Sequence, residues 1–226
     1  PLPDWTGIEK HQTNRALRAL ETFGVDPSIS REEFFEYKFD VEYSRESILA
    51  DVRNKYLREL NREKIPEEYL PALELIKSWN LRADSSNTAA ALSILTLPNA
   101  FRIEDLKFDT DSINIKLKES ISFLEKNFGS IEVPLGRVNR LLRGNTSLPL
   151  SGGPGTLRAV YSKKSGKVYK AVAGDCYIQA VEWGPDGQLN AWSVHQYGSS
   201  TNDKSSPHYD DQSKLFSKHE MKQIRP

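Results

Sequence analysis

The sequence has a single cysteine, Cys176, and a single methionine, Met221, among its 226 residues. One cysteine excludes an internal disulfide framework and any zinc or iron–sulfur site built from several cysteines. The chain opens on Pro1 in a proline-flanked stretch. We therefore expect that it begins at a cut inside a longer polypeptide, although processing or trimming would give the same start.

The sequence also lacks an excess of either charge, because 31 lysines and arginines balance 31 aspartates and glutamates. No net field then draws the chain toward nucleic acid or an anionic membrane surface. Long hydrophobic runs are missing as well, and none approaches the roughly 20 residues that a membrane-spanning helix needs. We predict no nucleic-acid partner and no membrane span.

What the sequence does contain is a hydrophobic pattern that changes its period once. Up to about Leu142 the apolar residues recur at helical spacing. They form four stripes: Ala16, Leu17, Leu20 and Phe23; Ile48, Leu49, Val52, Tyr56, Leu57 and Leu60; Leu73, Ile76 and Trp79; and Ile113, Leu117, Ile121 and Leu124. Ser30 and Glu33 have capping-box spacing, which predicts a further short helix. Residues 1–143 are therefore predicted to be mainly helical.

From Thr156 the spacing is that of short strands separated by turn signals at Ser165-Gly166, Gly174-Asp175 and Gly184-Pro185-Asp186-Gly187. We predict an antiparallel β meander over residues 144–226, with a Gly/Pro-rich loop at its start and an SPHYDDQ tail at its end. The fold class is then α+β, a helical segment followed by antiparallel strands. A meander of this size cannot bury both of its faces. Either the helices or a sheet from outside the chain must cover it.

The glycine-rich stretch from Gly152 to Thr156, "GGPGT", invites comparison with a phosphate-binding loop. It lacks the lysine of that signature, and it leads into a predicted strand instead of a helix N-terminus. We interpret it as a positioned backbone turn.

Two further chemistries have candidate residues. His195, His208, Asp210 and Asp211 offer imidazole and carboxylate ligands that suit zinc, but they lack the spacing of known metal motifs. Cys176 with His195 has the composition of a nucleophile and base, yet a lone cysteine in a strand is more often a small buried hydrophobe. We expect neither site, and no cofactor.

Two carboxylate pairs have the composition of an acid/base pair, Glu32-Glu33 and Glu67-Glu68. Both pairs fall at the predicted start of a helix, where the helix dipole favours negative charge. We interpret them as solvent-facing residues of the first helical turn.

Several stretches occur in an order and at a spacing that resemble one known family. They are "LGRVNRLLRG", "LPLSGGPGTLRA", "GDCYIQAVEW", "YGSS" and "SPHYDDQSKLF", with "TNRALRAL", "FEYKFDVEYS" and "WNLRAD" before them. Together they resemble the C-terminal part of the large (β) subunit of the penicillin acylase (penicillin amidase) family, in its acyl-homoserine-lactone acylase and aculeacin acylase branch. Asn80, where relatives often carry aspartate, and Cys176, where serine is common, depart from that branch.

The resemblance implies an N-terminal-nucleophile hydrolase with an αββα core, made as a precursor that cuts itself. In that family the serine that opens the large chain attacks an amide, and its own α-amino group is the base that a neutral hydroxyl needs. Backbone and asparagine donors hold the oxyanion. Here the first residue is Pro1, and no Gly-Ser or Gly-Cys junction precedes a large chain. The resemblance thus implies that the catalytic residues lie upstream of Pro1 and that this chain alone is inactive scaffold.

The resemblance also implies a structural role for the conspicuous "SSPHYDDQ" stretch, which brings serine, histidine and aspartate together in sequence. In relatives this segment returns the chain along the sheet edge, and a buried polar cluster must be hydrogen-bonded whatever its function. We expect the His208 imidazole to bond a backbone or carboxylate group, and Ser205 to be a turn residue. The predicted structural motif comprises Ser206, Pro207, His208, Tyr209, Asp211 and Gln212, with Gly152, Gly153 and Gly155.

Two functions from different classes follow. The first is a fragment of an amide hydrolase that deacylates N-acyl compounds such as an acyl-homoserine lactone or a lipopeptide. Its partners are the small subunit and the N-terminal part of the large subunit, and its location is periplasmic or secreted, as the resemblance implies. The second is a non-catalytic interaction or binding module with an acylase-like shape. A fragment exposes an apolar sheet face or self-associates, whereas a module covers its sheet.

Overall fold

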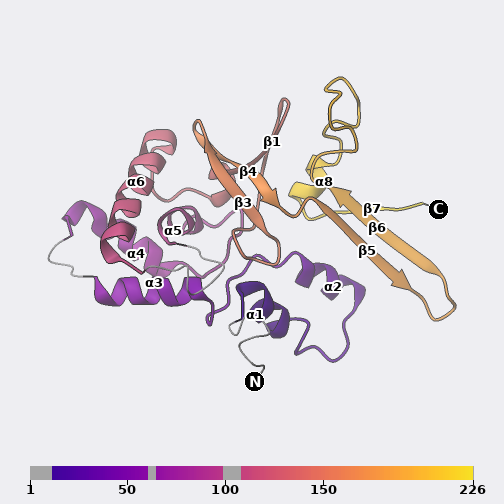
Figure 1. The fold of residues 1–226 in the computed structure, drawn as a ribbon, viewed down its shortest axis with the longest axis horizontal. Coiled ribbons are helices and arrows are strands. Elements are labelled where there is room, and N and C mark those ends of the chain that lie inside the picture. Colours follow the sequence, from indigo (N-terminus) through magenta and orange to yellow (C-terminus); the bar gives the residue numbers. More distant parts are fainter. Residues whose placement is uncertain (1–11, 61–64, 99–107, 226) are drawn as a thin grey trace, which may run out of the picture.

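The computed structural model describes residues 12–60, 65–98 and 108–225. The cut expected at Pro1 lies outside them. The helices between residues 48 and 128 lie on one side of the molecule, a twisted sheet lies in the middle, and a long hairpin extends on the opposite side (Figure 1). The predicted α+β class is confirmed.

Four of the described helices begin at a capping side chain. Ser30 and Glu33 form the predicted capping box, and Ser47 and Asp109 accept hydrogen bonds from first-turn amides. Gly129, at φ +79°, ends the longest helix. The helices are α1 (Asn14–Glu21), α2 (Arg31–Lys38), α3 (Ile48–Glu59), the 3-10 turn η3 (Glu67–Tyr69), α4 (Leu70–Ser78), α5 (Ala90–Thr96), α6 (Thr110–Phe128), α7 (Leu135–Val138) and α8 (Ser213–Ser217).

The strands form two sheets among the described residues. One has the order β2-β1-β4-β3 and the other the order β5-β6-β7. Their bounds are β1 (Asn139–Arg143), β2 (Thr146–Pro149), β3 (Val160–Ser165), β4 (Val168–Gly174), β5 (Tyr177–Trp183), β6 (Leu189–His195) and β7 (Lys222–Gln223).

The prediction of one continuous meander from Thr156 is wrong. The strands begin earlier, because β1 lies at the end of the segment predicted to be helical and β2 lies in the Gly/Pro-rich stretch after it. Hairpins β3–β4 and β5–β6 are antiparallel as expected, but they belong to different sheets. The reason is that β1 pairs in parallel with β4, at Asn139↔Tyr169 and Arg140↔Lys170. Both edges of β4 are then occupied, and β5 has to start a second sheet.

Two apolar cores hold these layers. The larger core lies among α3 to α7 and includes Tyr43, Tyr56, Ile76, Trp79 and Leu124, all almost fully buried. The smaller core joins the central sheet to the hairpin sheet and α8, and its members are Phe39, Leu141, Leu150, Val160, Ala171, Ile178, Val194 and Phe216. The first core draws mainly on the helical stripes and the second mainly on inward-facing strand positions, with residues of the adjoining loops in both. Within the described ranges no helix combines the length and apolar character needed to span a bilayer.

Candidate functional site

The loop over residues 198–212 carries the SSPHYDDQ stretch, and Arg143 anchors it. From the end of β1, the guanidinium donates hydrogen bonds to the carbonyl oxygens of Ser200 (3.1 Å), Thr201 (2.9 Å) and Tyr209 (3.3 Å). It also lies 3.8 Å from the centre of the Tyr209 ring and 4.8 Å from that of Tyr197. The loop is thus held by one cation that lies over two aromatic rings.

His208 points to a carboxylate and not to a hydroxyl. Its Nδ1 lies 2.9 Å from Oδ2 of Asp211, and 63% of its side chain is exposed. The partner is of the predicted type, but the cluster is open to water and not buried. Asp210 instead accepts a hydrogen bond from the hydroxyl of Thr146 on β2.

The two serines of the stretch serve the turn. Ser205 donates to Oδ1 of Asp203 at 2.6 Å, and the amide of His208 donates to Oγ of Ser206 at 3.2 Å. The bond from the Ser205 hydroxyl is the main cause that lowers the pKa of Asp203. Serine, histidine and aspartate that are adjacent in sequence therefore do not form one chain of hydrogen bonds.

Gln212 ties the end of this loop to β6 and is buried. Its Oε1 accepts a hydrogen bond from the amide of His195 at 3.0 Å, and its own amide donates to the carbonyl of Tyr197 at 2.8 Å. The loop thereby closes on itself before α8 begins.

The glycine-rich turn between the two cores uses its own amides internally. The amide of Gly152 donates to the carbonyl of Ala83 at 2.7 Å, and that of Gly153 donates to the hydroxyl of Thr156 at 3.0 Å. These two donors are therefore not available for a phosphate. Gly152 has φ +104°, and a Cβ there would lie 2.2 Å from the carbonyl oxygen of Arg158.

Arg158 is a fully buried cation that the sequence analysis missed. Its guanidinium lies 3.4 Å from the carboxylate of Asp175, donates to the carbonyl of Phe216 at 3.2 Å, and stacks 3.9 Å from the Phe216 ring centre. Lys38 also pairs with Asp175, at 2.9 Å. Burial lowers the pKa of Arg158, and Asp175 opposes that shift. An arginine inside the apolar run "TLRAVY" was the signal for this site.

His219 is the second missed group, and it lies near Arg158. Its ring stacks on Phe39 with centroids 4.9 Å apart, and its backbone has φ +61°. Nε2 is buried without a hydrogen-bond partner within the described part of the chain. The pKa of His219 is lowered to about 4, mainly by burial and next by the positive charge of Arg158. The negative charge of Asp84 raises it in part. No motif in the sequence marks this residue.

The cysteine does not behave as expected. Cys176 is exposed, which contradicts the prediction of a small buried hydrophobe. It precedes β5 in the short link between the two sheets, so neither core covers it. His195 packs its ring against Tyr177, with centroids 4.7 Å apart.

No described side chains form a nucleophile–base pair or a metal site. The hydrogen bonds of the described serine, threonine and cysteine side chains include none to an imidazole, and no group of three or more His, Cys, Asp or Glu residues is placed to hold a metal. Glu33 caps α2, while Glu67 and Glu68 are exposed in η3.

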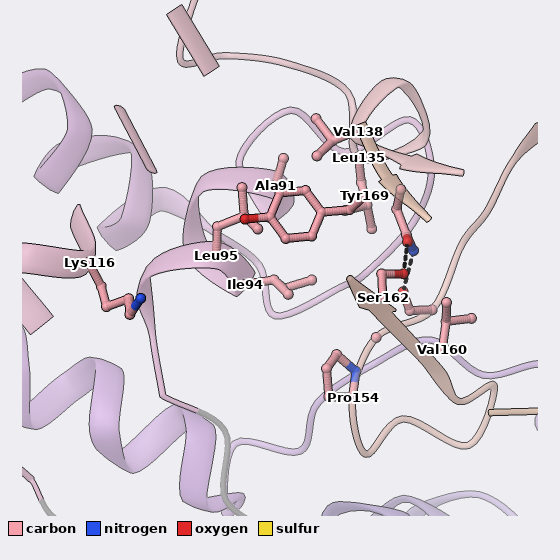
Figure 2. A pocket seen from close by; sticks show the side chains of 13 residues that line it. Ala91, Ile94, Leu95, Lys116, Leu135, Val138, Pro154, Val160, Ser162 and Tyr169 are labelled. Carbon is pink, nitrogen blue, oxygen red and sulfur yellow. Dashed lines mark hydrogen bonds between the residues drawn. The ribbon is translucent and has the colours of Figure 1, made fainter. Parts of the chain in front are cut away.

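A cavity of about 250 Å³ lies between α5 and the central sheet, beside the glycine-rich turn. Figure 2 shows the Tyr169 ring across it, with the hydroxyl toward Leu95, and Ser162 at the other end. The Ser162 hydroxyl donates a hydrogen bond to Oδ1 of Asn139, which also lines the cavity. Most of the remaining wall is apolar: Ala91, Ile94, Leu95, Leu135, Val138 and Val160.

Comparisons with known proteins match one family model and a number of solved structures. A family model described as penicillin amidase matches residues 2–225. The chain is similar to a thermostable penicillin G acylase from Alcaligenes faecalis, with a TM-score of 0.45 and 10% identity over 96% of this chain and 50% of that chain. The chain thus spans about half the length of that acylase. No curated protein matches.

Proposed function

We propose, from the premise that this chain belongs to the penicillin amidase family, that it is the C-terminal portion of the large subunit of an amide hydrolase. The reacting serine of the parent enzyme is supplied by a segment upstream of Pro1, and this chain contributes scaffold. The substrates we propose are N-acyl compounds such as an acyl-homoserine lactone or a lipopeptide, and the location is periplasmic or secreted.

The exposed face of the β5–β6 hairpin is the observation that carries this proposal. Along β5 the side chains alternate between buried and exposed, and the exposed set includes Tyr177, Val181 and Trp183. Leu189 pairs with Trp183 across the hairpin, and these two residues are 58% and 72% exposed. Large apolar side chains gathered on one sheet face usually mark a surface that another element covers.

The chemistry of the described residues supports the same conclusion. Each imidazole discussed above is engaged with a ring or a carboxylate, and none receives a hydrogen bond from a serine, threonine or cysteine. A serine without a base is a weak nucleophile at neutral pH. A supporting role for this chain, with the nucleophile on the remainder of the precursor, therefore fits better than catalysis by the chain alone.

The alternative, a non-catalytic module with an acylase-like shape, predicts a covered sheet and a stable monomer. The exposure of Trp183 and Leu189 favours the fragment. Light scattering and binding of a hydrophobic dye separate the two functions. We expect self-association or strong dye binding, both reduced in the Trp183→Ser variant. A compact monomer that binds no dye would support the module.

A direct test measures hydrolysis. The purified chain is incubated with a long-chain acyl-homoserine lactone and with a chromogenic penicillin analogue, alone and after co-expression with the upstream part of its precursor. We expect turnover only in the co-expressed sample, and weaker assembly with Trp183→Ser. Turnover by the chain alone would refute the assignment of the nucleophile to the upstream segment.

A further inference from the structure

The cavity beside the glycine-rich turn has walls suited to an aliphatic chain. Ala91 is fully buried at its wall, Val138 is almost fully buried, and Ile94 is partly buried. The polar pair at one end is already satisfied internally, because Ser162 donates to the Asn139 side chain and that side chain contacts the carbonyl of Gly152 at 3.4 Å. An apolar cavity with few free polar groups favours an apolar occupant.

A groove with a strong positive charge adjoins this cavity. It runs between α6 and the turn of the β3–β4 hairpin, and four lysines and one glutamate line it: Lys116, Lys118, Lys126, Lys164 and Glu119. Glu119 pairs with Lys116 at 2.8 Å, and Lys164 lies 5.0 Å from the ring centre of Phe123. The groove therefore keeps an excess of positive charge after its internal ion pair is counted.

The cavity and the groove share a boundary. Leu95, Lys116 and Tyr169 line both of them, and the Tyr169 ring packs edge-on against Phe123 at 5.2 Å. An apolar cavity and a cationic groove thus meet at Tyr169.

We infer that the cavity and the groove together bind an aliphatic monocarboxylate, whose chain occupies the cavity and whose carboxylate lies among the lysines. The apolar wall selects the chain by burial, and the lysines select a negative head group over a neutral one. The site uses none of the residues assigned to hydrolysis, and its occupancy does not depend on the proposed function.

Calorimetric titration of the 226-residue chain with butanoate, hexanoate and octanoate tests the chain-length dependence. Each added methylene that enters the cavity is expected to lower Kd about fourfold until the cavity is full. Acetate, which has the head group alone, should not compete with octanoate. 1-Octanol, which has the chain alone, should bind about two- to fivefold more weakly than octanoate. Equal affinity along the series, or competition by acetate, would overturn the inference.

Substitutions in the cavity distinguish octanoate binding at this site from binding to other apolar surfaces of the chain. Ala91→Leu and Ile94→Phe each fill the cavity and are expected to weaken octanoate binding at least tenfold, given the loss of about two buried methylenes. Circular dichroism checks that each variant is folded. Two positions are used so that one variant still tests the cavity if the other fails to fold. The matched control is Trp183→Ala on the exposed hairpin face, which should leave Kd unchanged. An unchanged Kd in both filling variants, or a loss of binding in the control, would place the ligand elsewhere.

The head-group contacts have their own pair of variants. The double variant Lys116→Gln/Lys164→Gln should weaken octanoate binding about two- to fivefold and leave 1-octanol binding unchanged. Lys167→Gln, in the turn of the same hairpin but outside the groove lining, is the control. An equal effect of both substitutions, or none from the first, would contradict a carboxylate among these lysines. All of these readouts measure binding, so they are independent of whether the parent enzyme hydrolyses an amide.

Discussion

The guanidinium of Arg143 lies 3.8 Å from the centre of the Tyr209 ring, although the two residues are 66 positions apart in the chain. The same group donates to the backbone oxygen of Tyr209 and to two other carbonyls of the loop. A single side chain at the end of β1 therefore holds residues 198–212 against the central sheet. It joins the "RLLRG" and "SPHYDDQ" stretches on which the family resemblance depends.

Arg143→Lys should loosen this loop. Lysine keeps the charge but lacks the planar group that stacks on Tyr209 and reaches three carbonyls at once. We expect the free energy of unfolding to fall by about 1–2 kcal/mol, with faster amide exchange across residues 198–212. Chemical denaturation and hydrogen exchange measure the two effects. Arg225→Lys is the control, and unchanged exchange in the loop would show that Arg143 does not anchor it.

The glycine-rich turn allows a matched comparison of two glycines. Gly155 has φ +82°, and the space where a Cβ would be is open. Gly155→Ala should therefore lower the free energy of unfolding only by the strain of a left-handed alanine, about 1–2 kcal/mol. Gly152→Ala adds a clash with the carbonyl of Arg158 and should cost considerably more. Urea denaturation of both variants gives the difference. Equal losses would mean that the backbone around Gly152 can move away.

The pair of Arg158 and Asp175 is suited to a double-mutant cycle. Asp175→Asn leaves a buried guanidinium without its counter-charge, and we expect a loss of about 2–3 kcal/mol, below the value for a fully buried pair because Asp175 is partly exposed. Arg158→Met in the Asp175→Asn background should restore part of that loss, because the uncompensated charge is gone. If the two substitutions changed the free energy of unfolding additively, Arg158 and Asp175 would not be directly coupled.

Acidification should destabilise the fold through His219. Its pKa is about 4 in the folded chain and near 6.5 when unfolded. Between these values the unfolded chain binds a proton that the folded chain does not, so stability falls as pH drops from 6.5 to 4, by about 3 kcal/mol at most. Above pH 6.5 His219 does not contribute to the pH dependence of the free energy of unfolding.

His219→Asn is the variant to compare, since asparagine tolerates the φ of +61° better than most residues. The difference in unfolding free energy between the parent and variant, measured in urea at pH 7, 6, 5 and 4, isolates the histidine from carboxylates that also titrate. We expect the difference to change steadily below pH 6.5. A constant difference would show that the imidazole takes up its proton normally in the folded state.

Local features were predictable from the sequence because their causes are local. The capping box at Ser30 and Glu33 and the stripes at Ile48–Glu59 and Thr110–Phe128 follow from side chains a few positions apart. The burial of Arg158, the stacked ring of His219 and the exposure of Cys176 depend on distant segments, so the sequence analysis missed the first two and was wrong about the third.

By itself, the sequence determined the α+β class and the ordered motifs that place the chain in its family, since hydrophobic period and motif order are properties of neighbours along the chain. Only the tertiary structure decided that β1 pairs with β4, that the strands divide into two sheets, and that a cavity meets a lysine-lined groove at Tyr169. The physical reason is that alternation tells which face of a strand is buried but not which strand lies beside it. The choice of neighbour is made by packing between residues far apart in sequence.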